Sequence, residues 1–185
     1  REFNKYRNIT FHTFNVNHSG ILGVLMIGLG MTHGKRSLVP MKPMPEWILN
    51  GSMMVKREFL GGLFGGDGCK IQNKINCSSN KNSFGCAMFS NVKDIKFEES
   101  LSTFMGCVSK LLNELEIRTL DIKREITKYD TNKVKIGVKI SDSEFNLIKF
   151  FNKIGYRYDR RKLMESAVSC EYLRHKTNHL GNRLN

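Results

Sequence analysis

The sequence is poor in several features that mark common protein classes. Its 185 residues hold five cysteines, an odd number, and no two of them form a C-x-x-C pair. This argues against a disulfide framework and a zinc finger, so we expect the cysteines to behave as small apolar residues in a reducing compartment. No segment reaches the roughly 20 apolar residues of a membrane span. The best candidate, 21–31, is too short and does not stand where a signal peptide would.

Acidic residues are scarce relative to basic ones. The chain carries 17 Asp and Glu against 30 Lys and Arg, a formal net charge of +13. A surplus of this size predicts a polyanionic partner, and nucleic acid is the first candidate. A basic ribosome-like or membrane-surface protein is the alternative. With 40% apolar residues, the chain is long enough for one ordinary domain or one and a half small ones.

The most informative segment is an apolar stretch, 59–68, that contains four glycines before Asp67 and ends on a fifth. Each glycine inside a helix costs about 0.5–1 kcal/mol relative to alanine, so these glycines indicate a close approach of two backbones. A carboxylate at the C-terminal end of a helix opposes the helix dipole. Asp67 is therefore predicted to serve a shared acidic site, and a simple C-terminal turn is the alternative.

Alternating apolar and basic residues predict a hairpin over 120–140. Val134, Ile136, Val138 and Ile140 share one face of its second strand, and lysines occupy the other. The first strand is predicted from Leu120, Ile122 and Ile126, with Lys123 pointing away from them, and turn residues at 129–132 join the two strands. A similar hairpin is predicted over 69–90, with Ile71 and Ile75 on one face and Lys70, Gln72 and Lys74 on the other.

Helical periodicity predicts three further elements. Apolar residues at spacings of three and four mark a helix over 97–115. A second helix follows the 120–140 hairpin, with Ser141 or Ser143 as its cap; its inward residues are Phe145, Ile148, Phe151 and Ile154. A last basic helix over 161–176 carries Leu163, Ala167 and Cys170.

From the glycine-rich helix onward, the predicted order is α-β-β-α-β-β-α. This is an α+β fold in which helices cover one face of an antiparallel sheet and lysines line the other. Such a basic face suits a DNA major groove, which is roughly 12 Å wide.

The first 50 residues look like the tail of a second copy of this unit. A strand-like stretch at 9–16 is followed by an apolar helix, and Leu29-Gly30 then precedes a basic cluster, as Ile154-Gly155 does. We therefore divide the chain into a remnant of a first repeat (1–39, strand plus helix), a proline-containing linker (40–56), a complete unit (57–176) and a tail (177–185). The start at Arg1 predicts a processed product, a domain or a fragment.

The glycine-rich segment resembles the motif of the LAGLIDADG, or DOD-type, homing endonucleases. The matching residues are Leu60, Gly62, Leu63, Asp67 and Gly68, whereas Gly65 replaces the first acidic residue of the motif. Other segments of intein-encoded members resemble the stretches at 34–36, 45–48 and 56–59, and the stretch at 154–158 with Lys162. The resemblance covers most of residues 20–175.

The resemblance implies a metal-dependent endodeoxyribonuclease that makes double-strand breaks at a long site, for homing of an intein or intron. Two units would pack their motif helices through Gly61, Gly62, Gly65 and Gly66, with the second unit supplied by an upstream repeat or a homodimer partner. Asp67 and the Gly66 carbonyl would hold Mg²⁺, or another divalent cation such as Mn²⁺, over the scissile phosphates of double-stranded DNA. The protein would lie inside the cell wherever the host DNA lies (nucleus, cytoplasm, organelle or virus-infected cell), and would not be secreted.

Basic and amide side chains complete the predicted site. Lys35 and Lys162 are candidates to contact the catalytic water network or a phosphate, one in each repeat, or are solvated backbone contacts. Gln72 is predicted to position water or read a base. The predicted DNA contacts are Lys70, Gln72, Lys74, Lys123, Lys135, Lys139, Arg157, Arg160 and Arg161. A lysine-rich strand face that serves only solubility is the alternative.

Two other functions remain open. A catalytically degenerate LAGLIDADG module, which binds DNA or acts as an RNA-splicing maturase, keeps the fold without cleavage. A basic structural RNA-binding protein is disfavoured by the lack of aromatic stacking motifs. Cleavage of supercoiled DNA with Mg²⁺ would separate the endonuclease from the degenerate module, and competition by RNA would identify the third function.

Overall fold

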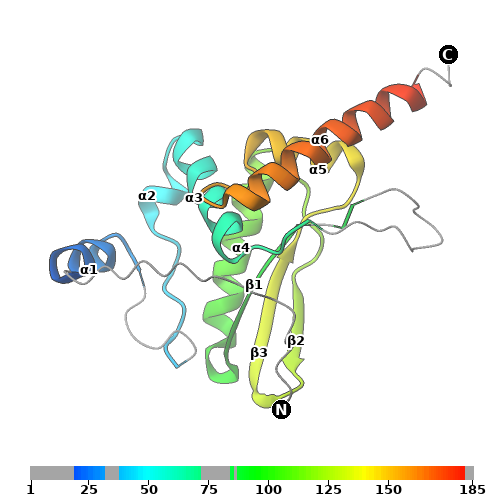
Figure 1. Ribbon diagram of the computed structural model, residues 1–185. Helices are drawn as coiled ribbons and strands as arrows, with labels where there is room; N and C mark the ends of the chain where they lie inside the picture. Colours follow the sequence, from blue (N-terminus) through cyan, green and yellow to red (C-terminus); the bar gives the residue numbers. More distant parts are fainter. Residues whose placement is uncertain (1–18, 32–37, 72–83, 86, 182–185) are drawn as a thin grey trace, which may run out of the picture.

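The computed structural model describes residues 19–31, 38–71, 84–85 and 87–181. Three short strands form one sheet, and helices pack beside it (Figure 1). In chain order the elements are α1 (Ser19–Gly28), α2 (Glu46–Leu49), α3 (Met53–Asp67), β1 (Met88–Asp94), the 3₁₀ turn η1 (Ile95–Phe97), α4 (Glu98–Glu114), β2 (Lys123–Thr127), β3 (Asp130–Lys139), α5 (Glu144–Lys153) and α6 (Arg160–Gly181).

The sheet is antiparallel, and β3 lies at its centre between β1 and β2. Gly137 of β3 stands opposite Ser90 of β1 on one side and Lys123 of β2 on the other. Val134, Ile136 and Val138 point into the core with 2% exposure or less, which confirms the predicted alternation. Because the side-chain period of a strand is two, the intervening lysines lie on the opposite face.

The core is built between the inner face of the sheet and the helices. α4 contributes six fully or nearly fully buried side chains, which confirms the predicted amphipathic helix. Phe64 of α3 and Phe150 of α5 meet edge to face, with ring centroids 5.1 Å apart, and Phe150 packs in the same way on Tyr156 at 5.6 Å. This aromatic cluster fixes α3 against α5 and the chain that follows it.

The apolar face of β2 lies on the predicted side of the sheet, since Ile126 stands opposite Val134, but it is not buried. The strand begins at Lys123, and Leu120, Ile122 and Ile126 are 41%, 37% and 48% exposed. The physical reason is topology, since β2 is an edge strand and α4 packs on β1 and β3. The helical layer therefore leaves this strand uncovered.

The inward face of α5 is confirmed in part. Ile154 is buried, and Ile148 and Phe151 pack against the core, but Phe145 is 71% exposed. Ser143 is at the N-cap position, and the helix also buries Asn146, Leu147 and Phe150. Asn146 accepts a hydrogen bond from the Arg118 amide and donates to two backbone carbonyls. A buried amide with these partners is stable in the core, although hydrophobic periodicity cannot predict it.

α6 is longer than the predicted helix, and of its three predicted apolar residues Cys170 is buried. Leu163 and Ala167 are exposed, whereas Ser166, Ser169, Cys170 and Leu173 face inward. The two serine hydroxyls donate to carbonyls of their own helix, which satisfies them inside the fold. Burial raises the pKa of the Cys170 thiol, as expected for a structural cysteine.

Several predictions concern residues outside the described ranges. These include the strand at 9–16 and most of the hairpin over 69–90, whose residues 72–83 are not described. The complete α-β-β-α-β-β-α order and the division into repeats stay predictions. The boundary between linker and unit at 56 falls inside α3, because the Ser52 hydroxyl caps that helix by accepting from the Val55 amide.

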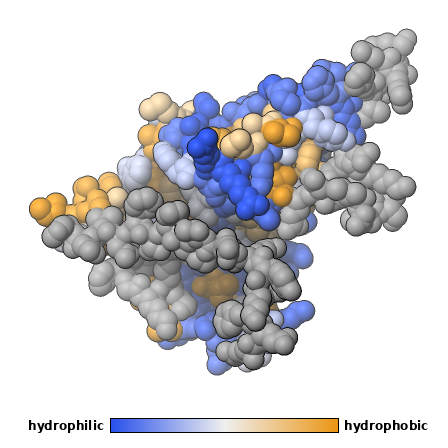
Figure 2. Space-filling model, in the orientation of Figure 1, coloured by the Kyte–Doolittle hydropathy of each residue, from blue (hydrophilic) through white to orange (hydrophobic). Residues whose placement is uncertain are grey.

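α1 is apolar all round and poorly covered. Ile21 is 89% exposed and Val24 70%, and the helix carries no charged residue in its first or last turn. Hydrophobic side chains gather over this helix at the left of the space-filling view (Figure 2). Among the helices of the described chain, none is long and apolar enough to cross a membrane.

Candidate functional site

The glycine-rich face of α3 packs against the loop between α5 and α6. Gly61 accepts a hydrogen bond from the Arg157 amide at 3.0 Å, and a Cβ added to Gly61 would lie 2.7 Å from Arg157 Cγ. A Cβ added to Gly65 would overlap the Arg157 carbonyl oxygen. These two glycines therefore allow a close contact within the chain. Gly62 lies beside the Tyr158 ring, and Gly66 faces open space.

Lys162 caps the C-terminal end of α3. Its ammonium group donates to the carbonyl oxygens of Gly65 at 2.7 Å, Gly66 at 3.1 Å and Gly68 at 2.9 Å. Carbonyls at this end of a helix carry the negative end of the helix dipole and lack partners within the helix, so a cation placed among them is stabilising. All three ammonium hydrogens have acceptors, which leaves none for the catalytic water or phosphate contact predicted from the sequence.

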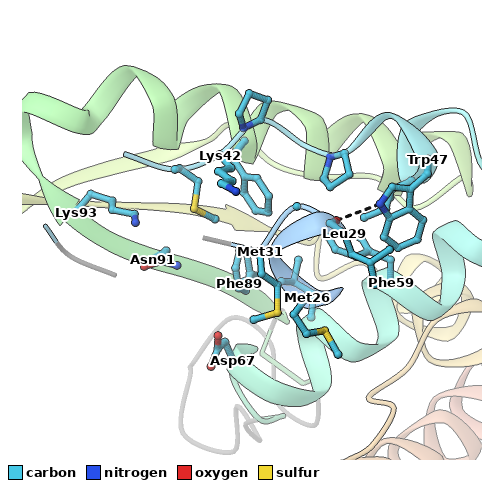
Figure 3. A pocket seen from close by; sticks show the side chains of 17 residues that line it. Met26, Leu29, Met31, Lys42, Trp47, Phe59, Asp67, Phe89, Asn91 and Lys93 are labelled. Carbon is cyan, nitrogen blue, oxygen red and sulfur yellow. Dashed lines mark hydrogen bonds between the residues drawn. The ribbon is translucent and has the colours of Figure 1, made fainter. Parts of the chain in front are cut away.

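Asp67 is exposed at the end of α3 and lines a groove of about 390 Å³. The groove lies between the α1 segment, α3 and β1; Figure 3 shows Met26 and Met31 with Asp67 on it, and Asn91 and Lys93 of β1. Its lining is mostly apolar. The second metal donor predicted from the sequence, the Gly66 carbonyl, already accepts from Lys162.

No metal centre is assembled within the described residues. They contain no group of three or more His, Cys, Asp or Glu side chains placed to hold an ion. Among the described residues that line the groove, Asp67 alone supplies a carboxylate. A divalent ion bound there would need further ligands from water or from a substrate.

Three of the predicted DNA-contacting lysines meet on the outer face of the sheet. Lys123 of β2 and Lys135 and Lys139 of β3 surround a hollow of about 170 Å³ together with Ser90, Gly137 and Glu125. Gly137 makes the hollow, because a Cβ there would lie 2.9 Å from the Ser90 Cβ. Glu125 accepts from Lys123 at 3.3 Å and is the single acidic residue among the described residues of this lining.

The third lysine of β3 is used by the hairpin turn. Lys133 lies 2.7 Å from Asp130, and the hydrogen bond between them lowers the pKa of the Asp130 carboxyl and raises that of Lys133. Lys135 and Lys139 are therefore the lysines of β3 that line the hollow.

The predicted arginine contacts lie elsewhere, in the loop before α6 and in its first turn. Arg157 forms an ion pair with Glu58 at 3.1 Å, and Arg161 pairs with Glu165 at 3.0 Å. Arg160 is exposed. Lys70 is also exposed, after the end of α3. Lys35, Gln72 and Lys74 lie outside the described residues, so their roles stay predictions.

Sequence reasoning missed two groups of residues. Lys93 is 1% exposed on the inner face of β1 and donates to the Val39 carbonyl at 3.0 Å, which ties the segment before α2 to the sheet. Glu58 joins Arg157 to Tyr158, whose hydroxyl donates to it at 3.2 Å. Lys93 carries no sequence signal, because it interrupts the apolar pattern of a core-facing strand.

The chain is similar to segments of much longer proteins. The tRNA-splicing ligase RtcB of Methanopyrus kandleri is 34% identical over 153 residues, which are 83% of this chain and 14% of that ligase. The tRNA-splicing ligase RtcB of Pyrococcus furiosus is 29% identical over the same shares. The replication factor C small subunit of Methanocaldococcus jannaschii is 35% identical over 133 residues, 71% of this chain and 6% of that protein.

The chain thus spans only 14% of the length of the ligases that it matches. No family model matches it. No solved structure matches it either.

These findings correct the resemblance drawn from the sequence. Relatives that cover most of the chain carry the name of an RNA ligase, and no model of a LAGLIDADG family matches. They overturn four predictions: the homing endonuclease of an intein or intron, the hydrolase acting on double-stranded DNA, the degenerate module, and the partnership with a second LAGLIDADG unit. The structure supplies a physical reason. Gly61 and Gly65 were predicted to form an interface between motif helices, but they pack against Arg157 of the same chain.

Proposed function

We propose that this chain is an RNA-binding segment of a longer protein of the tRNA-splicing ligase kind. The single observation that carries the proposal is the cluster of Lys123, Lys135 and Lys139 on the outer face of the sheet. The chain-wide charge of +13 supports it, since a polyanion is attracted over a longer range than the contact itself.

The shared segment contributes substrate binding and not the ligation chemistry. Proteins named for two different activities, a ligase and a replication factor, contain stretches similar to this one. Both names concern the handling of nucleic acid. Contact with a phosphate backbone would serve both, because it is independent of sequence and needs only positioned cations.

The predicted fourth strand belongs to the same proposal. The first strand of the predicted 69–90 hairpin, which carries Ile71 and Ile75, would extend the lysine face of the sheet, as the α-β-β-α-β-β-α order requires. Lys70, Gln72 and Lys74 would then contribute further contacts to RNA.

We also propose that a divalent cation, Mg²⁺ or Mn²⁺, accompanies the RNA at Asp67. One carboxylate does not make a protein-only site, but Mg²⁺ usually binds through one or two carboxylates, several waters and substrate phosphates. Asp67, exposed at the end of α3, fits that donor set when the RNA supplies the rest. The ion would neutralise phosphate charge there.

Charge reversal on the sheet face tests the proposal. Lys135→Glu and Lys139→Glu, alone and together, are compared with Lys110→Glu, the same change at an exposed position of α4. Fluorescence anisotropy with a structured RNA is expected to show about tenfold weaker binding for each sheet variant and unchanged binding for the control. The slope of log Kd against log salt should fall by about 0.7–0.9 for each lysine that no longer binds an RNA phosphate.

Two outcomes would contradict the proposal. Equal weakening by the α4 control would show that binding follows net charge alone. Unchanged binding by the double variant would place the RNA elsewhere on the molecule.

A further inference from the structure

Tyr158 is held in an unfavourable backbone conformation on the surface. It lies in the loop between α5 and α6, has φ of 65° and is 86% exposed. The left-handed region suits glycine and is uncommon for a residue with a large side chain. Such strain persists only where the surroundings enforce it, and it gathers at functional sites.

Neighbouring residues fix the position of this ring. The Tyr158 hydroxyl donates to Glu58 at 3.2 Å, and a Cβ added to Gly62 would lie 3.6 Å from the ring. Arg157 anchors the backbone before it through the Gly61 carbonyl and pairs with the same Glu58. One edge of the ring is thus held against α3, although the side chain remains largely exposed to solvent.

The anchored ring lies in a basic segment. Residues 157–162 contain four cations and one carboxylate, and Arg160 is exposed two residues after the tyrosine. Unpaired RNA bases stack on exposed aromatic rings, while nearby arginines contact the phosphates. A preformed ring lowers the entropy cost of this contact, since the side chain is already ordered.

We infer that Tyr158 is a stacking platform for an unpaired RNA base. This inference rests on the proposed RNA-binding function. It adds a preference for single-stranded nucleotides to the phosphate contacts made by the sheet. Tyr129, which is fully exposed in the turn between β2 and β3, provides a matched control on the same chain.

The test uses an RNA hairpin with 2-aminopurine in its unpaired loop and the same RNA fully paired. Wild-type protein is expected to quench the loop fluorophore. Tyr158→Leu should abolish the quench and weaken loop binding about tenfold, with paired RNA bound as before. Tyr158→Phe should retain the quench, because the ring face is unchanged, and Tyr129→Leu should behave as wild type.

Tyr158→Gly separates stacking from folding. Glycine relieves the positive φ, so this variant should be at least as stable as Tyr158→Leu in thermal unfolding while the quench is still absent. A quench that survives in Tyr158→Leu, or that Tyr129→Leu removes equally, would overturn the stacking role and leave RNA binding standing. Absence of RNA binding by the wild-type chain would overturn both.

Discussion

α1 and the 59–66 stretch of α3 are both apolar and contain glycine, but the fold uses them differently. In α3, Gly61 and Gly65 lie against Arg157, and replacement of either would force a neighbour to move. In α1, an added Cβ at Gly20, Gly23 or Gly28 would meet nothing within 4 Å among the described residues. The same local composition therefore marks a close backbone contact in one helix and an uncovered surface in the other. Only the tertiary partner distinguishes them.

The largest expected difference between the two helices is at Gly65 and Gly23. Gly65→Ala places a methyl group on the Arg157 carbonyl, which is backbone and cannot turn away, so we expect a loss of about 3 kcal/mol or more in the free energy of unfolding. Gly23→Ala should be neutral or stabilising by up to about 1 kcal/mol. Urea unfolding followed by circular dichroism measures both; equal effects would remove the distinction between the helices.

Removal of the cap on α3 should have the next largest effect. Lys162→Met keeps the apolar stem but leaves three backbone carbonyls without their cation, and we expect a loss of about 2–3 kcal/mol. Lys149→Met, which removes only a surface ion pair with Glu116 at 3.6 Å, is the control and should change the free energy of unfolding by less than about 1 kcal/mol. A loss in the control as large as that in Lys162→Met would show that the carbonyl contacts contribute little.

Gly61→Ala should give an intermediate result. The added methyl group meets the flexible side chain of Arg157, which can shift, so about 1–2 kcal/mol of destabilisation is expected. Gly66→Ala, further along the same helix and facing open space, should instead stabilise by about 0.5–1 kcal/mol. The two midpoints of chemical unfolding should move in opposite directions; a shared direction would contradict the assigned packing.

The smallest effect is expected on α1. Ile21 is 89% exposed, so Ile21→Lys should change the free energy of unfolding by no more than about 0.5 kcal/mol. Leu60→Ala in α3, at a fully buried position, should cost about 2–5 kcal/mol in the same assay. A large loss at Ile21 would show that α1 is covered in solution.

Local patterns predicted the parts of the fold that depend on nearest neighbours. The alternation in β3 and the three-four spacing in α4 are properties of single elements, and both faces were assigned correctly. In β2 the faces were assigned correctly but burial was not, because exposure depends on which strand lies at the edge of the sheet. Burial of Asn146 and Lys93 depends on partners distant in sequence, which periodicity does not contain.

The candidate site shows the same division. Lys123, Lys135 and Lys139 were placed together correctly because strand parity and antiparallel pairing decide their position. The contact of Gly61 and Gly65 with Arg157 was missed, since Arg157 reaches them only through the packing of α5 and α6. The role of Lys162 was missed for the same reason, as its carbonyl acceptors are formed by the end of another helix.

The most direct test of RNA binding is a comparison of one sequence presented as structured RNA and as duplex DNA. Fluorescence anisotropy with the 185-residue chain, in matched salt with Mg²⁺, would give both Kd values. We expect RNA to bind more tightly, and Lys135→Glu combined with Lys139→Glu to weaken this binding. Tighter binding of the duplex DNA, or its cleavage during the measurement, would contradict the proposed function.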